Sequence, residues 1–404
     1  MEGYKESYFG WVPVDWNVYV FKECISGFSS GSTPSRTVPE YFNGNINWIT
    51  SGELNYNIIV DTKEKVTQTA IKDSNLKLIP IGTFLIAITG LEAEKVRGAC
   101  GIVGKESVTN QSCMALYPKK DVLNVQYLFY FYSHFGEKLA FRYCQGTKQQ
   151  SYNAELVKIL PIIYPPLHEQ KAIADCLLTW DKAITLQTQL IKEKQLRKTA
   201  LMQQLLTGKK RLRGFTEEWE KEGAGAIFKS VSIKGETNEV LLSSTQDKGI
   251  IPRSMLEARV TMPTSGVEGF KLVEKGDFVI SLRSFQGGIE YSNYTGLVSP
   301  AYTVLKPKKP IVEEFYRQYF KSFEFIGRLA IAVVGIRDGK QISYDDFCTI
   351  KIPYPDFNTQ SAIANILQTA DLEIDLEQQK LNGLTQQKKA LMQQLLTGKV
   401  RLVS

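Results

Sequence analysis

Apolar residues recur three and four positions apart in two stretches of this 404-residue chain, residues 170–212 and 360–402. This spacing puts them on one face of an α-helix. The two stretches align without a gap, and 23 of the 43 positions are identical, including ALMQQLLTGK at 200–209 and 390–399. Each copy ends at a Thr-Gly pair, and Gly208 and Gly398 can adopt the left-handed conformation that ends a helix. The chain is therefore predicted to be an internal duplication, with a long helix closing each copy.

Each predicted helix needs a packing partner along much of its length. About 37 residues at about 1.5 Å per residue give a length of about 55 Å, whereas helices of globular proteins usually have about 8–20 residues. The other copy is the simplest partner, and we expect antiparallel pairing along an apolar seam of 3.5-residue period. The seam consists of Ile173, Leu177, Ile184, Ile191, Leu201 and Leu205 in the first copy and of Ile363, Leu367, Ile374, Leu381, Leu391 and Leu395 in the second.

Several leucines of the first helix fall off this seam, namely Leu178, Leu186, Leu190 and Leu196. Single apolar side chains are common on protein surfaces and need no special reason. Several on one helix nevertheless indicate a strip on which another protein subunit could dock.

The rest of the chain forms two globular parts of similar size. Residues 82–87 resemble 276–281, since both read as a glycine turn that leads into a buried strand, and residues 148–152 resemble 340–344. We therefore expect one α+β scaffold, used twice, with small mixed or antiparallel sheets. The predicted domains are residues 1–165 and 213–355, and the long helices occupy 166–212 and 356–404.

Composition changes this picture only slightly. The net charge of +7 and the pI of 8.8 favour nucleic acid weakly, because many other proteins match them. The densest basic cluster, Lys209, Lys210, Arg211 and Arg213, follows the first helix; it could stabilise the helix dipole, contact phosphate or seat an acidic partner. No apolar run approaches 18 residues, which predicts no membrane span, and six cysteines without CxxC spacing indicate a cytoplasmic protein.

The sequence lacks the usual signatures of catalysis. Its two histidines, His134 and His168, have no partner at metal-ligand spacing, and neither a GxxxxGK[ST] phosphate loop nor an Asn/Asp-Pro-Pro-Tyr/Phe motif of amino-methyltransferases is present. We therefore predict no catalytic residue, no metal and no cofactor in this chain. The sequence is therefore typical of a binding protein and not of an enzyme.

The order of these elements resembles the specificity (S) subunits of Type I restriction–modification systems. The resemblance covers almost the whole chain and is most specific in the two helix ends, LMQQLLTGKKRLRGF and LMQQLLTGKVRL. Residues 31–35, 39–44 and 48–50 are similar to the start of a target-recognition domain in that family, although Phe42 stands where the family often has Trp. Residues 283–288 and 296–302 also look like a family segment.

The resemblance implies a function and a set of partners. Each recognition domain would read one half of a bipartite, asymmetric site in double-stranded DNA, and the paired helices would fix the gap between the halves. Two methyltransferase (M) subunits carrying S-adenosylmethionine would dock beside the helices. Two restriction and motor (R) subunits would use ATP and Mg²⁺.

Candidate DNA contacts lie in polar loops. Lys and Arg bind phosphate, and Arg and Gln can also read guanine and adenine edges. The candidates are Ser32, Thr33, Arg36, Lys95, Arg97, Lys148, Gln149 and Gln150 in the first domain and Arg253, Arg283, Gln286, Arg337, Lys340 and Gln341 in the second. For each of them the alternative is a solvated surface residue or a turn stabiliser, and Trp48 is expected to pack in a core.

Two other classes of function compete with DNA recognition. A coiled-coil scaffold could join two protein-binding domains without touching DNA. A self-contained enzyme, such as a methyltransferase–nuclease fusion, is disfavoured by the missing motifs.

Overall fold

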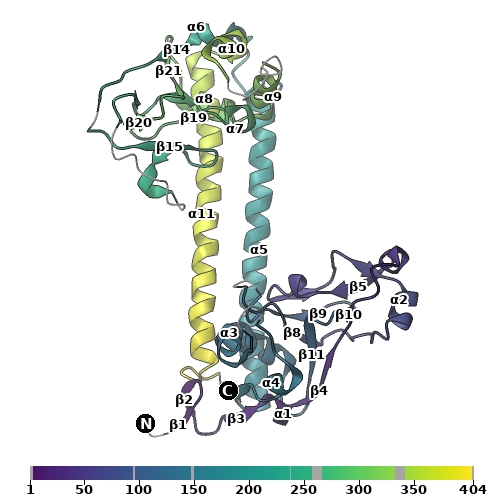
Figure 1. The fold of residues 1–404 in the computed structure, drawn as a ribbon. Helices are drawn as coiled ribbons and strands as arrows, with labels where there is room; N and C mark the ends of the chain where they lie inside the picture. The colour runs from purple at the N-terminus through teal and green to yellow at the C-terminus, as the bar shows by residue number, and fades with distance from the viewer. Residues whose placement is uncertain are drawn as a thin grey trace. The chain divides into compact units, whose positions relative to one another are not determined.

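The computed structural model describes residues 3–93, 96–146, 150–236, 238–256, 266–332 and 342–402 (Figure 1). The chain divides into two compact units. Unit 1 comprises Met1–Leu186 and Leu381–Ser404, and unit 2 comprises Gln187–Lys380. The two long helices, α5 (Leu167–Leu205) and α11 (Phe357–Leu395), each contribute one segment to each unit.

Unit 1 is built on a five-stranded sheet in the order β4-β11-β8-β9-β6, whose pairs are antiparallel except for β6 and β9. A smaller sheet has the order β10-β5-β7, and β1 with β2 and β3 with β12 form two-stranded pairs. The strands are β1 (Tyr4–Ser7), β2 (Gly10–Pro13), β3 (Asn17–Val20), β4 (Ile25–Ser30), β5 (Ile46–Ile49), β6 (Asn57–Ile59), β7 (Lys65–Val66), β8 (Phe84–Ala87), β9 (Cys100–Val103), β10 (Ser107–Thr109), β11 (Cys113–Pro118) and β12 (Pro161–Tyr164). The shorter helices are α1 (Phe21–Cys24), α2 (Gln68–Asp73), α3 (Val125–Tyr143) and α4 (Ala154–Lys158), with single 3₁₀ turns at Pro39–Phe42 and Ser51–Glu53.

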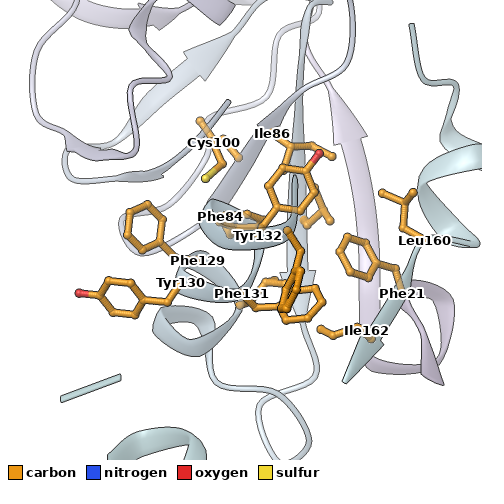
Figure 2. Close-up of a cluster of buried hydrophobic side chains, with 14 of the residues drawn as sticks. Phe21, Phe84, Ile86, Cys100, Phe129, Tyr130, Phe131, Tyr132, Leu160 and Ile162 are labelled. Carbon is orange, nitrogen blue, oxygen red and sulfur yellow. The ribbon is translucent and has the colours of Figure 1, made fainter. Parts of the chain in front are cut away.

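Helix α3 supplies the centre of the unit 1 core. Its aromatic run from Tyr127 to Tyr132 is buried against the main sheet, where Phe84 and Ile86 of β8 are fully buried (Figure 2). Burial of these apolar side chains stabilises the unit by about 25 cal/mol for each Å² of apolar surface removed from water. Trp48 lies in β5, is 2% exposed and belongs to a separate small hydrophobic cluster. Its predicted packing in a core is confirmed.

Unit 2 repeats the scaffold with a four-stranded antiparallel sheet in the order β14-β21-β18-β19. The pairs β13 with β22, β15 with β16 and β17 with β20 are also antiparallel. The strands are β13 (Glu220–Gly223), β14 (Phe228–Val231), β15 (Leu242–Thr245), β16 (Gly249–Pro252), β17 (Lys271–Val273), β18 (Phe278–Ile280), β19 (Glu290–Tyr291), β20 (Gly296–Val298), β21 (Thr303–Pro307) and β22 (Lys351–Tyr354). The helices are α6 (Ala224–Ile227), α7 (Ser284–Gly287), α8 (Glu313–Tyr319), α9 (Phe323–Ala332) and α10 (Tyr344–Thr349), with a 3₁₀ turn at Arg253–Met255.

The two units share one design down to individual hydrogen bonds. The order β4-β11-β8-β9 in unit 1 matches β14-β21-β18-β19 in unit 2. Tyr127 Oη donates to the carbonyl of Ile163, and Tyr316 Oη donates to that of Pro353, both at 2.9 Å. The prediction of one α+β scaffold used twice is confirmed, and the parallel pairs of unit 1 make its sheets mixed.

A glutamine that is identical in the two copies of the repeat lies near the start of each long helix and makes equivalent contacts. Gln170 and Gln360 are 0% and 1% exposed, and each donates its amide to the carbonyl of the proline five residues earlier. Their side-chain oxygens accept the backbone N–H of Asn124 and of Val312, at 2.8 Å. Each glutamine thus ties its helix to the strand–helix connection of its own unit, and its polar groups are satisfied in the core.

Within each unit the segments of α5 and α11 run antiparallel. In unit 1, Asp181 pairs with Lys388 at 2.5 Å and accepts a hydrogen bond from Tyr130 Oη. In unit 2, Asp371 pairs with Lys198 at 2.5 Å. These contacts explain why Lys198 and Lys388 are identical in the repeat although both lie off the apolar seam.

The residues of the predicted seam are all buried or half-buried. Ile173, Leu177 and Leu395 are buried in the core of unit 1, whereas Leu205, Ile363 and Leu367 are buried in the core of unit 2. Ile191 is also buried, and the remaining seam residues, Ile184, Leu201, Ile374, Leu381 and Leu391, are half-buried. The ends of the seam are therefore part of the two globular cores, while most of its other residues are partly covered.

Candidate nucleic-acid interface

The loop between β8 and β9, residues 88–99, carries one group of candidates in unit 1. Arg97 donates its Nε to the carbonyl of Leu91 at 2.9 Å and its Nη2 to that of Glu92 at 3.2 Å. The guanidinium also lies 5.7 Å from the ring centre of Phe141. Arg97 therefore fixes the shape of its own loop as well as adding positive charge to it.

Gln150 lies on the other side of the same loop. Its backbone N–H donates to Glu92 Oε2 at 2.9 Å, and its carbonyl accepts the N–H of Leu91 at 3.0 Å. The structure thus brings Arg97 and Gln150, 53 positions apart in the chain, to the two sides of Leu91 and Glu92. Lys95, Lys148 and Gln149, predicted for the same region, lie outside the described residues.

Ser32 and Thr33 follow strand β4 and are engaged in loop contacts. Ser32 Oγ donates to the carbonyl of Ser74 at 3.1 Å, and Thr33 Oγ1 donates to Gln111 Oε1 at 2.6 Å. The next residue, Ser112, accepts the N–H of Ile88 through its carbonyl. Thr33 is consequently linked through residues 111–112 to the start of the β8–β9 loop.

Arg36 already has an anionic partner. Its guanidinium binds both carboxylate oxygens of Glu64, with Nη2 at 2.8 Å from Oε2, and lies 4.2 Å from the ring centre of Phe42. This hydrogen bonding lowers the pKa of the Glu64 carboxyl below its usual value. A phosphate at Arg36 would have to compete with Glu64, which weakens the case for Arg36 among the candidates.

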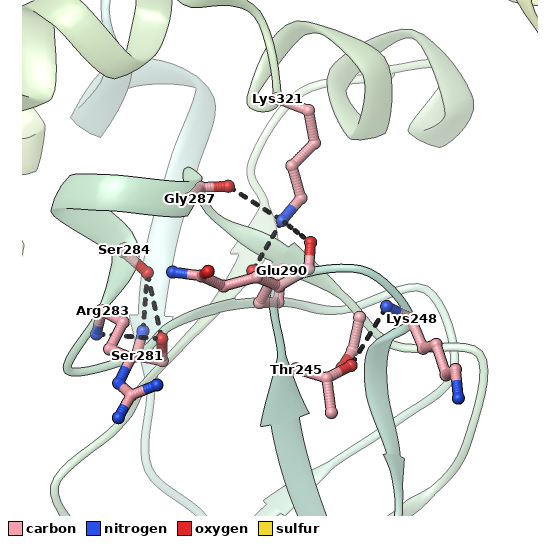
Figure 3. Close-up of polar contacts among 10 residues, drawn as sticks. Thr245, Lys248, Ser281, Arg283, Ser284, Gly287, Glu290 and Lys321 are labelled. Atoms are coloured by element: carbon pink, nitrogen blue, oxygen red, sulfur yellow. Dashed lines mark hydrogen bonds and ion pairs between the residues drawn. The ribbon is translucent and has the colours of Figure 1, made fainter. Parts of the chain in front are cut away.

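The equivalent loop of unit 2, between β18 and β19, presents Arg283 and Gln286. Ser281 and Ser284 are buried, and the N–H of Ser281 donates to Ser284 Oγ at 2.8 Å (Figure 3). The carbonyl of Arg283 accepts the N–H of Gln286 at 2.9 Å. This buried serine pair shapes the turn into α7, and the side chains of Arg283 and Gln286 are left exposed.

Arg253 lies elsewhere in unit 2, just after β16. Its guanidinium is 5.7 Å from the ring centre of Phe270, and its backbone N–H donates to the carbonyl of Leu241. Its buried Nε has no hydrogen-bond partner within the described ranges. Arg337, Lys340 and Gln341 lie outside those ranges.

A part-buried ion pair, in which Glu290 is buried and Lys321 is partly exposed, is the feature that the sequence did not reveal. Lys321 Nζ donates to Glu290 Oε1 at 2.6 Å, to the carbonyl of Gly287 at 2.9 Å and to that of Gln246 at 3.2 Å (Figure 3). A cavity of about 510 Å³ adjoins these residues and is lined also by Lys248 and Arg317. No periodicity or motif marks these residues, because they come from four separate elements.

The basic residues after the long helices divide into two kinds. Arg211 packs 4.6 Å from the ring centre of Trp219, and Arg401 binds both Asp15 and Glu169. These two therefore have structural partners within their units. Lys209, Lys210 and Arg213 are exposed.

The described ranges contain neither a cluster of metal ligands nor a helix suited to crossing a membrane. No three His, Cys, Asp or Glu side chains gather there as metal ligands would. Of the helices described, none combines the length and the apolar character that crossing a bilayer requires.

Comparison with known proteins identifies the family. The profile of the Type I restriction modification DNA specificity domain matches twice, at residues 13–194 and 217–386. The putative MjaX Type I restriction enzyme specificity subunit of Methanocaldococcus jannaschii is 26% identical over 441 aligned positions, which cover 99% of this chain and 97% of the relative.

Solved structures agree in fold. The S subunit of a Type I restriction–modification system from M. genitalium has a TM-score of 0.56 at 17% identity and covers 94% of this chain and 96% of its own. A chain from a structure on the assembly and conformational transition of the Type I system has a TM-score of 0.61 at 16% identity and covers 96% and 99%. With the family profile matched in both halves, this chain belongs to the specificity subunits of Type I restriction–modification systems, which are non-catalytic.

Proposed function

We propose that this subunit gives its complex a preference for a bipartite, asymmetric site in double-stranded DNA, with one half read by each globular domain. The observation that carries the proposal is that equivalent loops of one scaffold present different side chains. The β8–β9 loop carries Arg97, whereas the β18–β19 loop carries Arg283 and Gln286. Side chains of these types bind phosphates and base edges, so different loops on one scaffold would read different sequences.

The long helices serve as the spacer and as the docking surface in this proposal. Leu186 and Leu376 occupy the same position of the repeat and are 66% and 64% exposed. Leu190 and Leu196 are 37% and 62% exposed, while Leu178 is half-buried. An exposed leucine repeated in both copies suits two like partners, which we identify as the two M subunits, joined by two R subunits.

The cofactors belong to those partners. S-adenosylmethionine would be bound by the M subunits, and ATP with Mg²⁺ by the R subunits, so that this chain contributes DNA recognition alone. The complex would act in the cytoplasm, in keeping with six cysteines that are all free.

Exchange of one domain tests the modular part. Residues 213–355 are replaced by the same segment of another family member, the complex is reconstituted, and methylated positions are mapped across a genome. We expect one half of the target to change and the other to stay. A change in both halves, or in neither, would contradict the proposal.

Salt dependence separates DNA recognition from a scaffold function. A complex that neutralises phosphates should lose affinity steeply between about 50 and 200 mM salt while keeping its sequence preference. A scaffold for two protein-binding domains would show neither property.

A further inference from the structure

The ammonium of Lys321 joins three separate segments of unit 2. It lies at the corner between α8 and α9 and uses its three N–H donors on the β15–β16 turn, at Gln246, on the end of α7, at Gly287, and on β19, at Glu290. Figure 3 shows these contacts converging on Nζ. All four segments belong to unit 2.

The end of α7 lies close to the α8–α9 corner and to the β15–β16 turn. Gly288 has a φ of +80°, and a Cβ there would lie 2.0 Å from the carbonyl oxygen of Phe320. A Cβ on Gly287 would lie 3.0 Å from Cγ of Gln246. At position 288 only glycine allows α7 to approach the α8–α9 corner so closely, whereas at position 287 the neighbour is the side chain of Gln246.

Glu290 makes Lys321 hard to replace. Glu290 is 1% exposed, and its second oxygen, Oε2, has no hydrogen-bond partner in the part of the chain that the structure describes. Burial raises the pKa of this carboxyl, whereas the neighbouring Lys321 lowers it. The ammonium is therefore the group that compensates the buried charge.

The segments that Lys321 holds together also carry exposed polar side chains. Arg283 and Gln286 are exposed at α7, and Gln246 and Lys248 are exposed on the β15–β16 turn. In unit 1 the equivalent loop is held differently, by Arg97 and by the bonds of Gln150 to Leu91 and Glu92. The Lys321–Glu290 pair has no counterpart among the contacts that the structure describes for the β8–β9 loop.

Resting on the proposed function, we propose that Lys321 is a positioning residue for DNA reading by the second domain. It does not itself contact DNA. It fixes the α7 turn against the β15–β16 turn, so that Arg283, Gln286, Gln246 and Lys248 form one preorganised reading surface.

The test uses the reconstituted methyltransferase complex and duplexes of its mapped target. Lys321→Met removes the ammonium but leaves Glu290 charged and buried, which can impair folding. The double variant Lys321→Met/Glu290→Leu removes both charges and keeps the core apolar. Lys309→Met is the matched control, because Lys309 pairs with Glu222 in the same unit, at 2.6 Å, away from α7.

Methylation rates are compared for the intact target and for single-base changes in each half. In the double variant we expect discrimination at the half-site read by the second domain to fall about tenfold, which is the scale of one base contact. Discrimination at the half-site read by the first domain should stay within about twofold. Lys321→Arg, which keeps the charge, should recover part of the loss. Lys309→Met should leave both halves as in the parent.

The outcomes separate the two proposals. A double variant that melts like the parent and still discriminates fully at the second half would overturn the positioning function of Lys321. Equal loss at both halves would overturn it as well. If exchange of residues 213–355 alters neither half of the target, the proposed function itself fails, whatever the Lys321 variants do.

Discussion

Gln187 donates its side-chain amide to Glu377, the residue that holds the same position in the second copy of the repeat, at 2.8 Å from Oε2 and 3.0 Å from the carbonyl oxygen. Gln187 is only 6% exposed. Two like helices that run antiparallel must bring one pair of equivalent positions face to face, and here that pair is Gln187 and Glu377. The duplication has diverged at this position, so that a donor meets an acceptor.

This pairing predicts a cost for making the two positions alike. Gln187→Glu would place two carboxylates together in a nearly dry contact and should lower the free energy of unfolding by about 1–3 kcal/mol. Urea unfolding at pH 7 measures the loss, which should shrink at acidic pH as the carboxylates become protonated. Gln195→Glu, at an exposed position of the same helix, is the control and should change little.

Arg401 predicts a larger effect in unit 1. It binds Glu169 through Nε and Nη2, both at 2.7 Å, and Glu169 is 0% exposed. Arg401→Met would leave this carboxylate buried without its partner and should destabilise the protein by about 3 kcal/mol. Chemical denaturation of Arg401→Met/Glu169→Leu should show a smaller loss, since no charge is then left unpaired; equal losses would contradict the explanation.

Asp15, the second partner of Arg401, predicts a pH dependence. Hydrogen bonding to Arg401 lowers the pKa of Asp15 below its ordinary value of 3.8. A carboxyl whose folded pKa is lowered stabilises the protein above the unfolded pKa and loses that contribution as pH falls through the folded value. Asp15→Asn should therefore be less stable than the parent at pH 6, and the difference should shrink as the pH falls below 3.8 through the lowered pKa of the folded state. In an Arg401→Met background the difference at pH 6 should disappear.

The exposed leucines at equivalent positions predict a defect in assembly without a defect in folding. Leu186→Lys/Leu376→Lys should shift the free energy of unfolding by less than about 0.5 kcal/mol, because both side chains are exposed. Copurification with the M subunit should be lost. Gln189→Lys/Gln379→Lys adds the same charges at another pair of equivalent exposed positions and should retain the M subunit.

Helix length predicts the gap between half-sites. Four residues inserted into both helices, after Leu186 and after Lys380, lengthen each by about 6 Å and leave the pairs within each unit intact. The unspecified gap of the methylated target should grow by one or two base pairs, at about 3.4 Å each, while the half-site sequences stay the same. The same insertion after Gly214, in the link between α5 and β13, should leave the gap unchanged.

The sequence predicted the helices well because their signal is local and written twice. The 3.5-residue seam, the glycine ends and the identical lysines at 198 and 388 all have counterparts in the structure, with Gly208 and Gly398 at φ values of +70° and +68°. The shared scaffold was predicted from glycine turns before β8 and β18, which again are short-range patterns.

The contacts that shape the candidate interface could not be predicted in this way. Glu64, which accepts hydrogen bonds from Arg36, is 28 positions away in the sequence. Gln246, whose carbonyl accepts a hydrogen bond from Lys321, is 75 positions away. Polar loops indicate which side chains are available, but only the fold decides which of them already have partners. Arg401 is likewise bound to a carboxylate 232 positions away, that of Glu169.

The division of the chain into units has a consequence for its biosynthesis. Unit 2 is one continuous segment, whereas unit 1 is completed by residues 381–404, and Leu395 and Leu396 are buried in its core. A polypeptide emerging from the ribosome therefore holds all of the second domain before it holds the last pieces of the first. The first part of unit 1 must wait, with part of its interior uncovered, until residues 381–404 have been synthesised, and a nascent chain stalled near residue 380 would be a target for chaperones or proteases.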